Sequence, residues 1–455
     1  GILADYLMRK GSEVVNMLLD EYDYETDIEV QREEAREQGR AEGREEGREQ
    51  GRAEGREQGK EEGREEGRKE EKRLIEIIRD VLAGKNKSEW SMQISKEEIE
   101  RVIKCARVHG VLPFLQECPV FMEEPYREKL FFYLKDYAYE DAQQAYAAET
   151  LFELFEKNGI YCMPLKGIRT KQFYPYPEFR TMGDLDILYK EDQTKKLKQV
   201  MQDAGYKFGG YNIKHDEYEK DGVTIEMHRD VLFRLTNAYD YFADIWERAI
   251  HAKGKQYIYE MSLEDHYLHS VCHLAEHFVR GGIGIRMVLD IYILSETPRM
   301  DKAYVQRQLK ALKLQKFEEN IRSLAQLWFS DDEKTVRTEV SDELENYALS
   351  GGIFGSRETA RRNGTVLYES KNKFVKQLVF PSYEVMKTSC PWLKTPILLP
   401  AAWLVRYKRA LTASRGNIGY HIERAKTFDR VEDQEQKERC QFFERCGLED
   451  VSENF

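Results

Sequence analysis

Apolar residues recur at helical spacing in two long stretches of the chain, and at a period of two in the stretch between them. The first stretch runs over residues 88–157 and opens with a capping box formed by Ser95 and Glu98. Gly159 ends it, and helical spacing returns at Leu263 and continues almost to the end of the chain. We therefore expect an α+β protein in which a small sheet is flanked by mostly helical regions.

The middle stretch predicts short strands and short helices in alternation. We expect strands at residues 160–165, 185–189 and 223–228, and helices at residues 168–173 and 193–204. The changes of period divide the chain into four expected domains. These are a charged glycine-repeat tail (1–85), an N-terminal helical region (86–159), a sheet-forming core (160–260) and a helical C-terminal region (261–455).

The tail contains a glycine at every fourth position from Gly39 to Gly67. Residues 31–72 hold 12 basic and 15 acidic side chains in 42 positions, so most of this stretch is charged. Each i,i+3 Glu–Arg pair adds a few tenths of a kcal/mol to a helix, whereas each interior glycine costs about 0.8–1 kcal/mol. We expect a solvated, marginal helix or a linker, with self-association through this helix as the functional alternative.

The overall charge limits the classes of partner. The 455 residues carry 71 basic and 83 acidic side chains, a net charge of −12, which argues against broad binding of nucleic acid. The seven cysteines are scattered without a CxxC pair, and the longest apolar run, residues 395–405, is too short to span a membrane. We expect a reduced, cytoplasmic protein. Because the chain opens with Gly rather than Met, we expect a fragment or a processed product.

Three acidic residues carry the candidate chemistry. Asp184 and Asp186 share one face at the start of a predicted strand, directly after Gly183, and Glu226 stands on a second predicted strand, VTIEMH. If the strands are neighbours, the three carboxylates can hold divalent cations for phosphoryl transfer. The alternative is a turn with solvated aspartates. Since like charges repel, we expect replacing Asp184 or Asp186 by Asn to leave the metal-free protein no less stable.

The order of these elements resembles the DNA polymerase β nucleotidyltransferase superfamily. More closely, LKG, YP, FRTMGDLDIL, IEMH and DHYLHSVCHLAEHF resemble the uncharacterised bacterial nucleotidyltransferase family of that superfamily, over about residues 88–410. The resemblance implies a small mixed β-sheet of the polymerase-β type. It also implies that Asp184, Asp186 and Glu226 are the catalytic and metal-binding acids.

The turn after the first strand departs from the superfamily pattern. The resemblance implies a Gly-Ser element that holds the triphosphate, and Lys166-Gly167 stands in that place here. We expect Lys166, Gly167, Arg180 and Gly183 to bind the nucleotide, with Lys166 and the amides of the following helix as phosphate contacts. The alternatives are a solvated Lys166 and an Arg180 that pairs with Glu178 or Asp184.

Two further features lie on predicted helices. His266, His269, His273 and His277 share one helix face, which favours a polar wall of the active cleft over a zinc site or simple packing. Asp290 lies on an apolar helix, and a buried acid needs a partner, so we expect a histidine of the preceding helix to pair with it. We expect the aromatic residues of 131–139 to belong to the core rather than to a base-stacking platform.

The resemblance implies Mg²⁺-dependent (or Mn²⁺-dependent) transfer of a nucleoside monophosphate from a nucleoside triphosphate. The expected donor is ATP, and the expected acceptor is a hydroxyl or amine of an unidentified small molecule or protein. The alternative is an inactive, antitoxin-like module with the same fold that only binds. A third class is an interaction protein organised by the glycine-repeat helix.

The first 80 or so residues, with LLDEYDYETDIEV before the repeat, resemble the C-terminal tail of PD-(D/E)xK-type nuclease-like transposases. The catalytic part of those proteins is absent from this resemblance, so it implies no nuclease activity.

Overall fold

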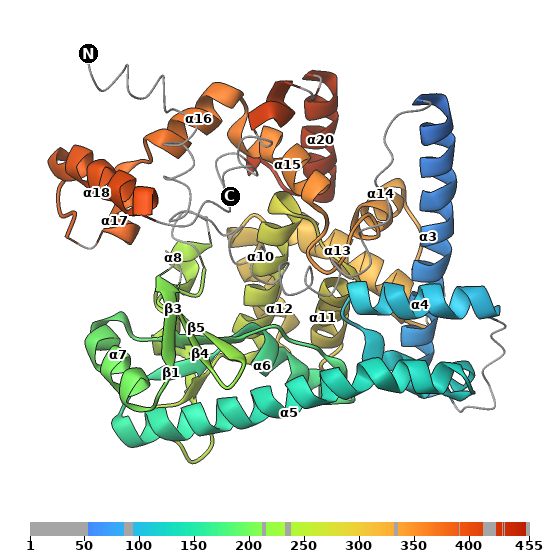
Figure 1. The fold of residues 1–455 in the computed structure, drawn as a ribbon, viewed down its shortest axis with the longest axis horizontal. Coiled ribbons are helices and arrows are strands. Elements are labelled where there is room, and N and C mark those ends of the chain that lie inside the picture. The colour runs from blue at the N-terminus through green and yellow to red at the C-terminus, as the bar shows by residue number, and fades with distance from the viewer. Residues whose placement is uncertain are drawn as a thin grey trace.

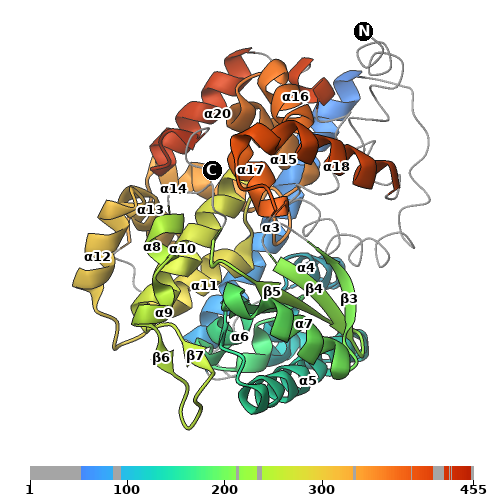
Figure 2. The same ribbon diagram turned by 90° about the vertical axis from the view of Figure 1, so that its left-hand side faces the viewer.

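Five strands form one mixed sheet in the computed structural model (Figures 1 and 2). The strands are β1 (Cys162–Pro164), β2 (Leu185–Tyr189), β3 (Lys207–Tyr211), β4 (His215–Lys220) and β5 (Val223–His228), and their order in the sheet is β1-β2-β5-β4-β3. β2 and β5 are parallel, and the other neighbours are antiparallel. The expected α+β class is confirmed, as are the three predicted strands. The polar β3–β4 hairpin was not predicted.

The structure describes residues 53–85, 94–211, 215–232, 238–331, 335–390, 392–412, 425–429, 431 and 433–451. The stretch that resembles a transposase tail lies mostly outside these residues, and that resemblance stays a prediction. The structure does describe the end of the glycine repeat, as helix α3 (Ala53–Leu82).

The apolar face of the sheet is covered by α5 (Tyr126–Asn158) and α7 (Thr194–Asp203). Leu185 and Ile187 of β2 pack against these helices, because alternate residues of a strand point to one face. Gly159 ends α5 in a left-handed conformation at φ 59°, where glycine is favoured, as the sequence predicted. Of the aromatic residues expected in the core, Tyr133 and Tyr137 of α5 do pack against it, whereas the expectation was wrong for Phe131, Phe132 and Tyr139, which are exposed.

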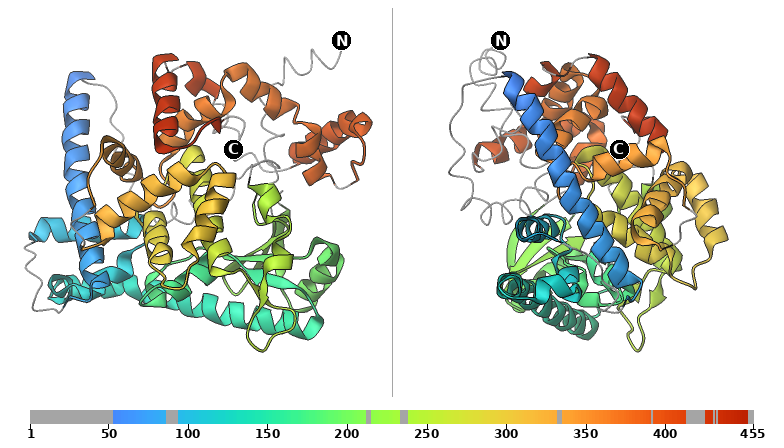
Figure 3. Two further views of the ribbon diagram at one scale, coloured as in Figure 1. Left: turned by 180° about the vertical axis from the view of Figure 1, so that it is seen from behind. Right: turned by 90° about the vertical axis from the view of Figure 1, so that its right-hand side faces the viewer.

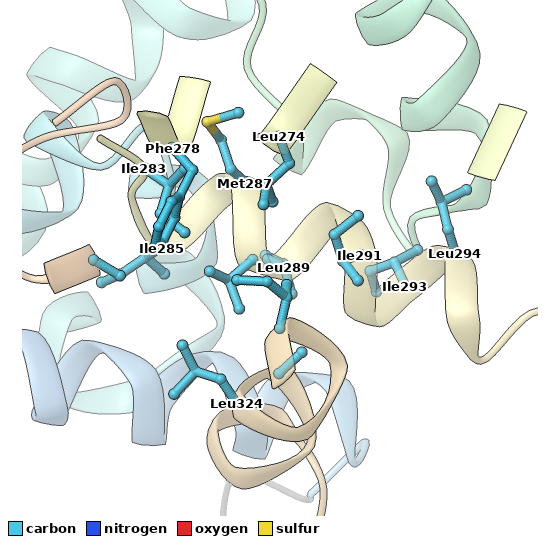
Figure 4. Packing of buried hydrophobic residues seen from close by; sticks show 14 of the residues in the cluster. Leu274, Phe278, Ile283, Ile285, Met287, Leu289, Ile291, Ile293, Leu294 and Leu324 are labelled. Atoms are coloured by element: carbon cyan, nitrogen blue, oxygen red, sulfur yellow. The ribbon is translucent and has the colours of Figure 1, made fainter. Parts of the chain in front are cut away.

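The largest core lies between the helices that follow the sheet and those that precede it. α10 (Leu263–Arg280), α11 (Ile285–Ser295) and α13 (Gln315–Phe329) pack side by side through leucine, isoleucine and phenylalanine side chains (Figure 4). Leu74, Ile77 and Ile78 of α3 are fully buried in the same core, next to α4 (Lys96–Val108). The packed part of the chain therefore begins before residue 85, and the expected domain boundaries stay predictions.

The remaining helices surround this core and extend the C-terminal part (Figure 3). They are α6 (Lys166–Thr170), α8 (Tyr239–Phe242), α9 (Ile245–Arg248), α12 (Lys302–Ala311), α14 (Glu339–Ala348), α15 (Arg357–Tyr368), α16 (Lys371–Val379), α17 (Tyr383–Ser389), α18 (Leu399–Thr412) and α20 (Asp433–Cys446). A small hairpin, β6 (Ile250–His251) with β7 (Tyr259–Glu260), projects beside α9 (Figure 2). In the part of the chain that the structure describes, no helix is long and apolar enough to cross a membrane.

Candidate active site

The register of β2 and β5 brings two of the three predicted acids together. Asp186 and Glu226 are directly paired on these parallel strands, and both side chains are buried on the sheet face opposite the one that α5 covers. Asp184 stands two residues earlier, directly before β2, and is partly exposed. The strand pairing on which the site prediction depended is therefore present in the structure.

Two histidines complete the same face. His228 follows Glu226 by two residues on β5, and His215 of β4 is its direct partner across the antiparallel pair. His228 Nε2 lies 2.9 Å from Asp186 Oδ1 and 3.1 Å from Glu226 Oε2, and His215 Nδ1 lies 3.2 Å from the same Glu226 oxygen. Asp186, His215, Glu226 and His228 are all buried, and we call them the sheet cluster.

The charges of these groups depend on one another. Burial raises the pKa of Asp186, but the Lys166 ammonium and His228 more than offset this and hold the pKa well below its usual value. Burial also raises the pKa of Glu226, and His215 and His228 hold it below its usual value. Both carboxylates are therefore ionised at neutral pH, which is the state that binds cations.

Lys166 is the predicted phosphate contact, and the structure places it against the sheet cluster. Its Nζ lies 2.8 Å from Asp186 Oδ1. Burial lowers the pKa of Lys166, but Asp186, Glu226 and Asp184 together raise it above its usual value, so the ammonium stays charged. Its backbone φ of 33° lies in a region that non-glycine residues rarely adopt, which indicates local strain at this position.

Gly167 and Arg180 have structural partners of their own. A Cβ at residue 167 would lie 2.6 Å from Met182 Sδ, so a side chain at this position would force the Met182 side chain to move. Arg180 donates two hydrogen bonds to Asp290, at 2.9 and 2.8 Å, and Tyr174 donates a third at 2.7 Å. The expected histidine partner of Asp290 is wrong, and so are the two partners suggested for Arg180. The roles of Gly167, Arg180 and the exposed Gly183 in nucleotide binding stay predictions.

Arg286 is a cation at the site that the sequence did not suggest. It lies in the first turn of α11, and its Nη1 donates to the carbonyl oxygen of Thr181 at 2.9 Å. No hydrogen-bond partner of Arg286 Nε is found among the residues that the structure describes. Burial and the neighbouring Arg180 lower its pKa to about 10, while Asp290 and Asp184 act in the opposite sense. Arg286 therefore stays charged near neutral pH and lies within electrostatic reach of Asp184.

The histidine-rich helix α10 lies on the side of the sheet away from α5 (Figures 1 and 2). His266 Nε2 is 3.0 Å from Thr170 Oγ1, just after the Lys166 turn. His269 is fully buried, and neither ring nitrogen has a hydrogen-bond partner among the described residues. Burial and Lys166 lower the pKa of His269 to about 3, and Asp186 and His228 also act on it, so this ring lies within electrostatic reach of the sheet cluster. The role of these histidines as a polar wall of the active cleft stays a prediction.

A second group of metal-binding residue types lies outside the sheet. The group consists of Glu71 of α3 together with Cys105 and His109 at the end of α4, and we call it the helix cluster. Each residue offers one ligand atom, and the three atoms lie within 4.8 Å of one another. His109 Nε2 lies 3.5 Å from Glu71 Oε1, and His109 Nδ1 accepts a hydrogen bond from the backbone N–H of Ile285 at 3.4 Å.

A pocket of about 590 Å³ lies between α5 and α6, where Met182 and Leu185 line it. The side chain of Leu185 points away from that of Asp186, so this pocket opens on the other side of β2. The acceptor was expected to enter from the C-terminal helices, and that expectation stays a prediction.

One comparison with known proteins gives a match. The model of a family described as uncharacterised nucleotidyltransferase matches residues 95–330, which is just over half of the chain and contains all five strands of the sheet. No curated protein and no solved structure matches the chain. The predicted resemblance to a nucleotidyltransferase family is confirmed, whereas the polymerase-β superfamily and a bacterial origin stay predictions.

Proposed function

The chain belongs to the uncharacterised nucleotidyltransferase family, and on this premise we propose that it transfers a nucleoside monophosphate in a reaction that depends on a divalent cation. ATP is the proposed donor of AMP. The proposed acceptor is a hydroxyl or amine of a small molecule or a protein. In the transfer, the acceptor atom forms a bond to the α-phosphorus, the bond to pyrophosphate breaks, and the acceptor loses its proton.

One observation carries this proposal. Asp186 and Glu226 are paired on adjacent parallel strands, and Asp184 stands partly exposed directly before the strand that contains Asp186. Ionised oxygen ligands at this spacing fit Mg²⁺ or Mn²⁺, and the lowered pKa values of Asp186 and Glu226 keep them ionised. A bound cation would neutralise the charge of the triphosphate and orient it.

The cations of the site would hold the phosphate oxygens. Lys166 and Arg286 both lie within electrostatic reach of Asp184, so a triphosphate next to that residue would meet two positive charges. Arg180 is less available because its Nε and Nη2 donate to Asp290, which leaves only Nη1, on the side of Gly167, for a ligand. We therefore propose Arg286, rather than Arg180, as the arginine that contacts the nucleotide.

The test is transfer of label from α-labelled ATP in the presence of Mg²⁺ or Mn²⁺, together with release of pyrophosphate. Asp184→Asn should abolish both signals in a protein that remains folded. Asp192→Asn replaces an exposed aspartate eight residues later and should leave them unchanged. Transfer that persists in Asp184→Asn would contradict the proposal.

A second candidate is a module that binds nucleotide without turning it over. The observation in its favour is that Lys166 and His228 already occupy Asp186, and that Lys166-Gly167 replaces the expected Gly-Ser turn. In that case ATP should raise the melting temperature while no pyrophosphate appears in the presence of any tested acceptor.

Self-association through the N-terminal helix remains a separate proposal. Removing residues 1–52 and measuring the mass in solution tests it, because α3 packs into the core from Glu70 onward and a longer deletion would disturb the fold.

A further inference from the structure

The polar face of the sheet is built from two rows of side chains. Asp186, Glu226 and Glu217 are neighbours across three strands and form a row of carboxylates. The next row along the same strands contains His228 and His215. A site of aspartates and glutamates alone would suit Mg²⁺, which prefers oxygen ligands, so the two imidazoles change the chemistry of this face.

The spacing of the donor atoms fits coordination of one ion. The nitrogen or oxygen atoms offered by His215, Glu226 and His228 all lie within 4.8 Å of one another, and the two nearest pairs are separated by 3.1 and 3.2 Å. Two ligands bound at about 2.1 Å from one ion, at tetrahedral or octahedral angles, lie roughly 3.0–3.4 Å apart. Asp186 Oδ1, at 2.9 Å from His228 Nε2, is a fourth donor, and it would have to exchange its ion pair with Lys166 for the metal ion.

The neighbouring helix supplies an independent observation. His269 of α10 lies within electrostatic reach of Asp186 and His228, is fully buried, and has no hydrogen-bond partner at either nitrogen among the described residues. A buried polar group normally has a partner, so this ring indicates that the face holds something besides protein.

We propose that the sheet cluster binds one first-row transition metal ion through His215, Glu226 and His228, in preference to Mg²⁺. Asp186 would supply a further carboxylate ligand to the same ion. Imidazole together with carboxylate is a donor set that such ions favour, while Mg²⁺ discriminates against nitrogen. The proposal takes from the proposed function only that this site holds a divalent cation.

Mn²⁺ is the most stringent probe, because later ions of the series bind nitrogen ligands more tightly than Mn²⁺ does. The full chain, stripped of metal, is titrated by calorimetry with MnCl₂ and separately with MgCl₂, without nucleotide. We expect one Mn²⁺ per chain, bound at least tenfold more tightly than Mg²⁺. Pulsed electron paramagnetic resonance of the Mn²⁺-bound protein should show coupling to directly bound nitrogen. Equal or tighter binding of Mg²⁺, or bound Mn²⁺ without nitrogen coupling, would overturn the proposal.

Variants locate the ligands. His215→Gln and His228→Gln should each weaken Mn²⁺ binding at least tenfold and remove part of the nitrogen coupling, while Mg²⁺ affinity changes less than threefold. His251→Gln, at an exposed position on β6, is the matched control and should change neither. If His215→Gln fails to fold, the nitrogen coupling of Mn²⁺ in the wild-type protein still tests the proposal, because that measurement uses no variant. Nitrogen-coupled Mn²⁺ in a protein that transfers no nucleotide would refute the proposed function and leave this inference standing.

Discussion

The sheet cluster and the helix cluster contain the same kinds of side chain but have different chemistry. In the helix cluster, His109 Nδ1 accepts a backbone hydrogen bond from Ile285, so the proton of the neutral ring lies on Nε2, which faces Glu71. Neither nitrogen then has a lone pair to offer a metal. Burial, followed by the charge of Glu71, raises the pKa of the Cys105 thiol, so this residue is no thiolate ligand either.

In the sheet cluster, Nε2 of His228 also faces ionised carboxylates, but no hydrogen bond to its Nδ1 is found among the described residues. The ring proton can therefore move to Nδ1 and leave Nε2 free to bind a metal ion. Residue type and proximity alone therefore do not define a metal site. The hydrogen-bond partners of the ring nitrogens decide whether a histidine can act as a ligand.

The largest expected difference between the clusters is in catalysis. Asp186→Asn should lower the rate of nucleotidyl transfer by about 10³-fold or more, because it removes a charge that would hold the cation. Glu71→Gln, in the helix cluster, should change the rate less than about threefold. Initial rates of pyrophosphate release, with folding checked by circular dichroism, measure both. An equal loss of transfer rate in Asp186→Asn and Glu71→Gln would contradict a catalytic role that is confined to the sheet cluster.

Arg286→Gln should raise the KM for ATP by about 10–100-fold and leave the fold intact, because it removes the proposed phosphate contact beside Asp184 (a charged hydrogen bond contributes about 1.5–3 kcal/mol). The matched control is Arg307→Gln, an exposed arginine of α12. A KM that is unchanged in Arg286→Gln would exclude this arginine from the nucleotide site.

Asp186→Asn should also destabilise the metal-free protein, by about 1–3 kcal/mol, because it leaves the Lys166 ammonium and His228 without their charged partner. Denaturant unfolding in the presence of a chelator measures this. The sequence had suggested the opposite sign, from repulsion among the acids. If the variant is at least as stable as the wild type, relief of the repulsion among the acids offsets the lost pairing with Lys166 and His228.

Stability should depend on pH through His269, which lies within electrostatic reach of the sheet cluster. The pKa of His269 is about 3 in the folded protein and about 6.5 in the unfolded chain, so only the unfolded state binds a proton between these values. Stability should therefore fall as the pH drops from 6 to 4.5, by up to about 1.4 kcal/mol per pH unit for this residue. His269→Gln should flatten that slope in urea unfolding at several pH values, and an unchanged slope would contradict the assignment.

The smallest effect is expected in the helix cluster. His109→Gln should destabilise the protein by about 1 kcal/mol, the contribution of a typical hydrogen bond, because it disturbs the acceptor of the Ile285 N–H. Thermal melting measures this loss, and calorimetry should give an Mn²⁺ affinity equal to that of the wild type. A weakened Mn²⁺ affinity would make the helix cluster a metal site.

The sequence predicted the elements whose pattern is local. Alternation around Asp186 and Glu226 identified β2 and β5, Ser95 and Gly159 marked two helix ends, and all of these are present. The β3–β4 hairpin was missed because HDEYEK is polar on both faces, and His215 was missed with it. The weak signal that could have found it was Tyr218, an aromatic residue between polar neighbours that packs in the apolar core of the sheet.

Contacts between distant segments could not be predicted in the same way. Asp290 pairs with Arg180, which is 110 positions away, and Arg286 reaches the carbonyl of Thr181 across a separation of 105. No spacing rule connects such residues, because the turn that brings α11 to the sheet is set by the packing of the whole helical core.

The anchorage of α3 has a mechanical consequence. From Glu70 to Leu82 the helix is held by buried leucine and isoleucine side chains, and Arg79 donates to the carbonyl oxygens of Leu327 and Trp328 (Figure 3). The 17 residues before Glu70 extend about 25 Å along the helix axis and include a glycine at every fourth position. A pulling force applied at residue 53 should therefore unfold residues 53–69 of α3 before it displaces residues 70–82, which are held in the core. The sheet should then remain undisturbed.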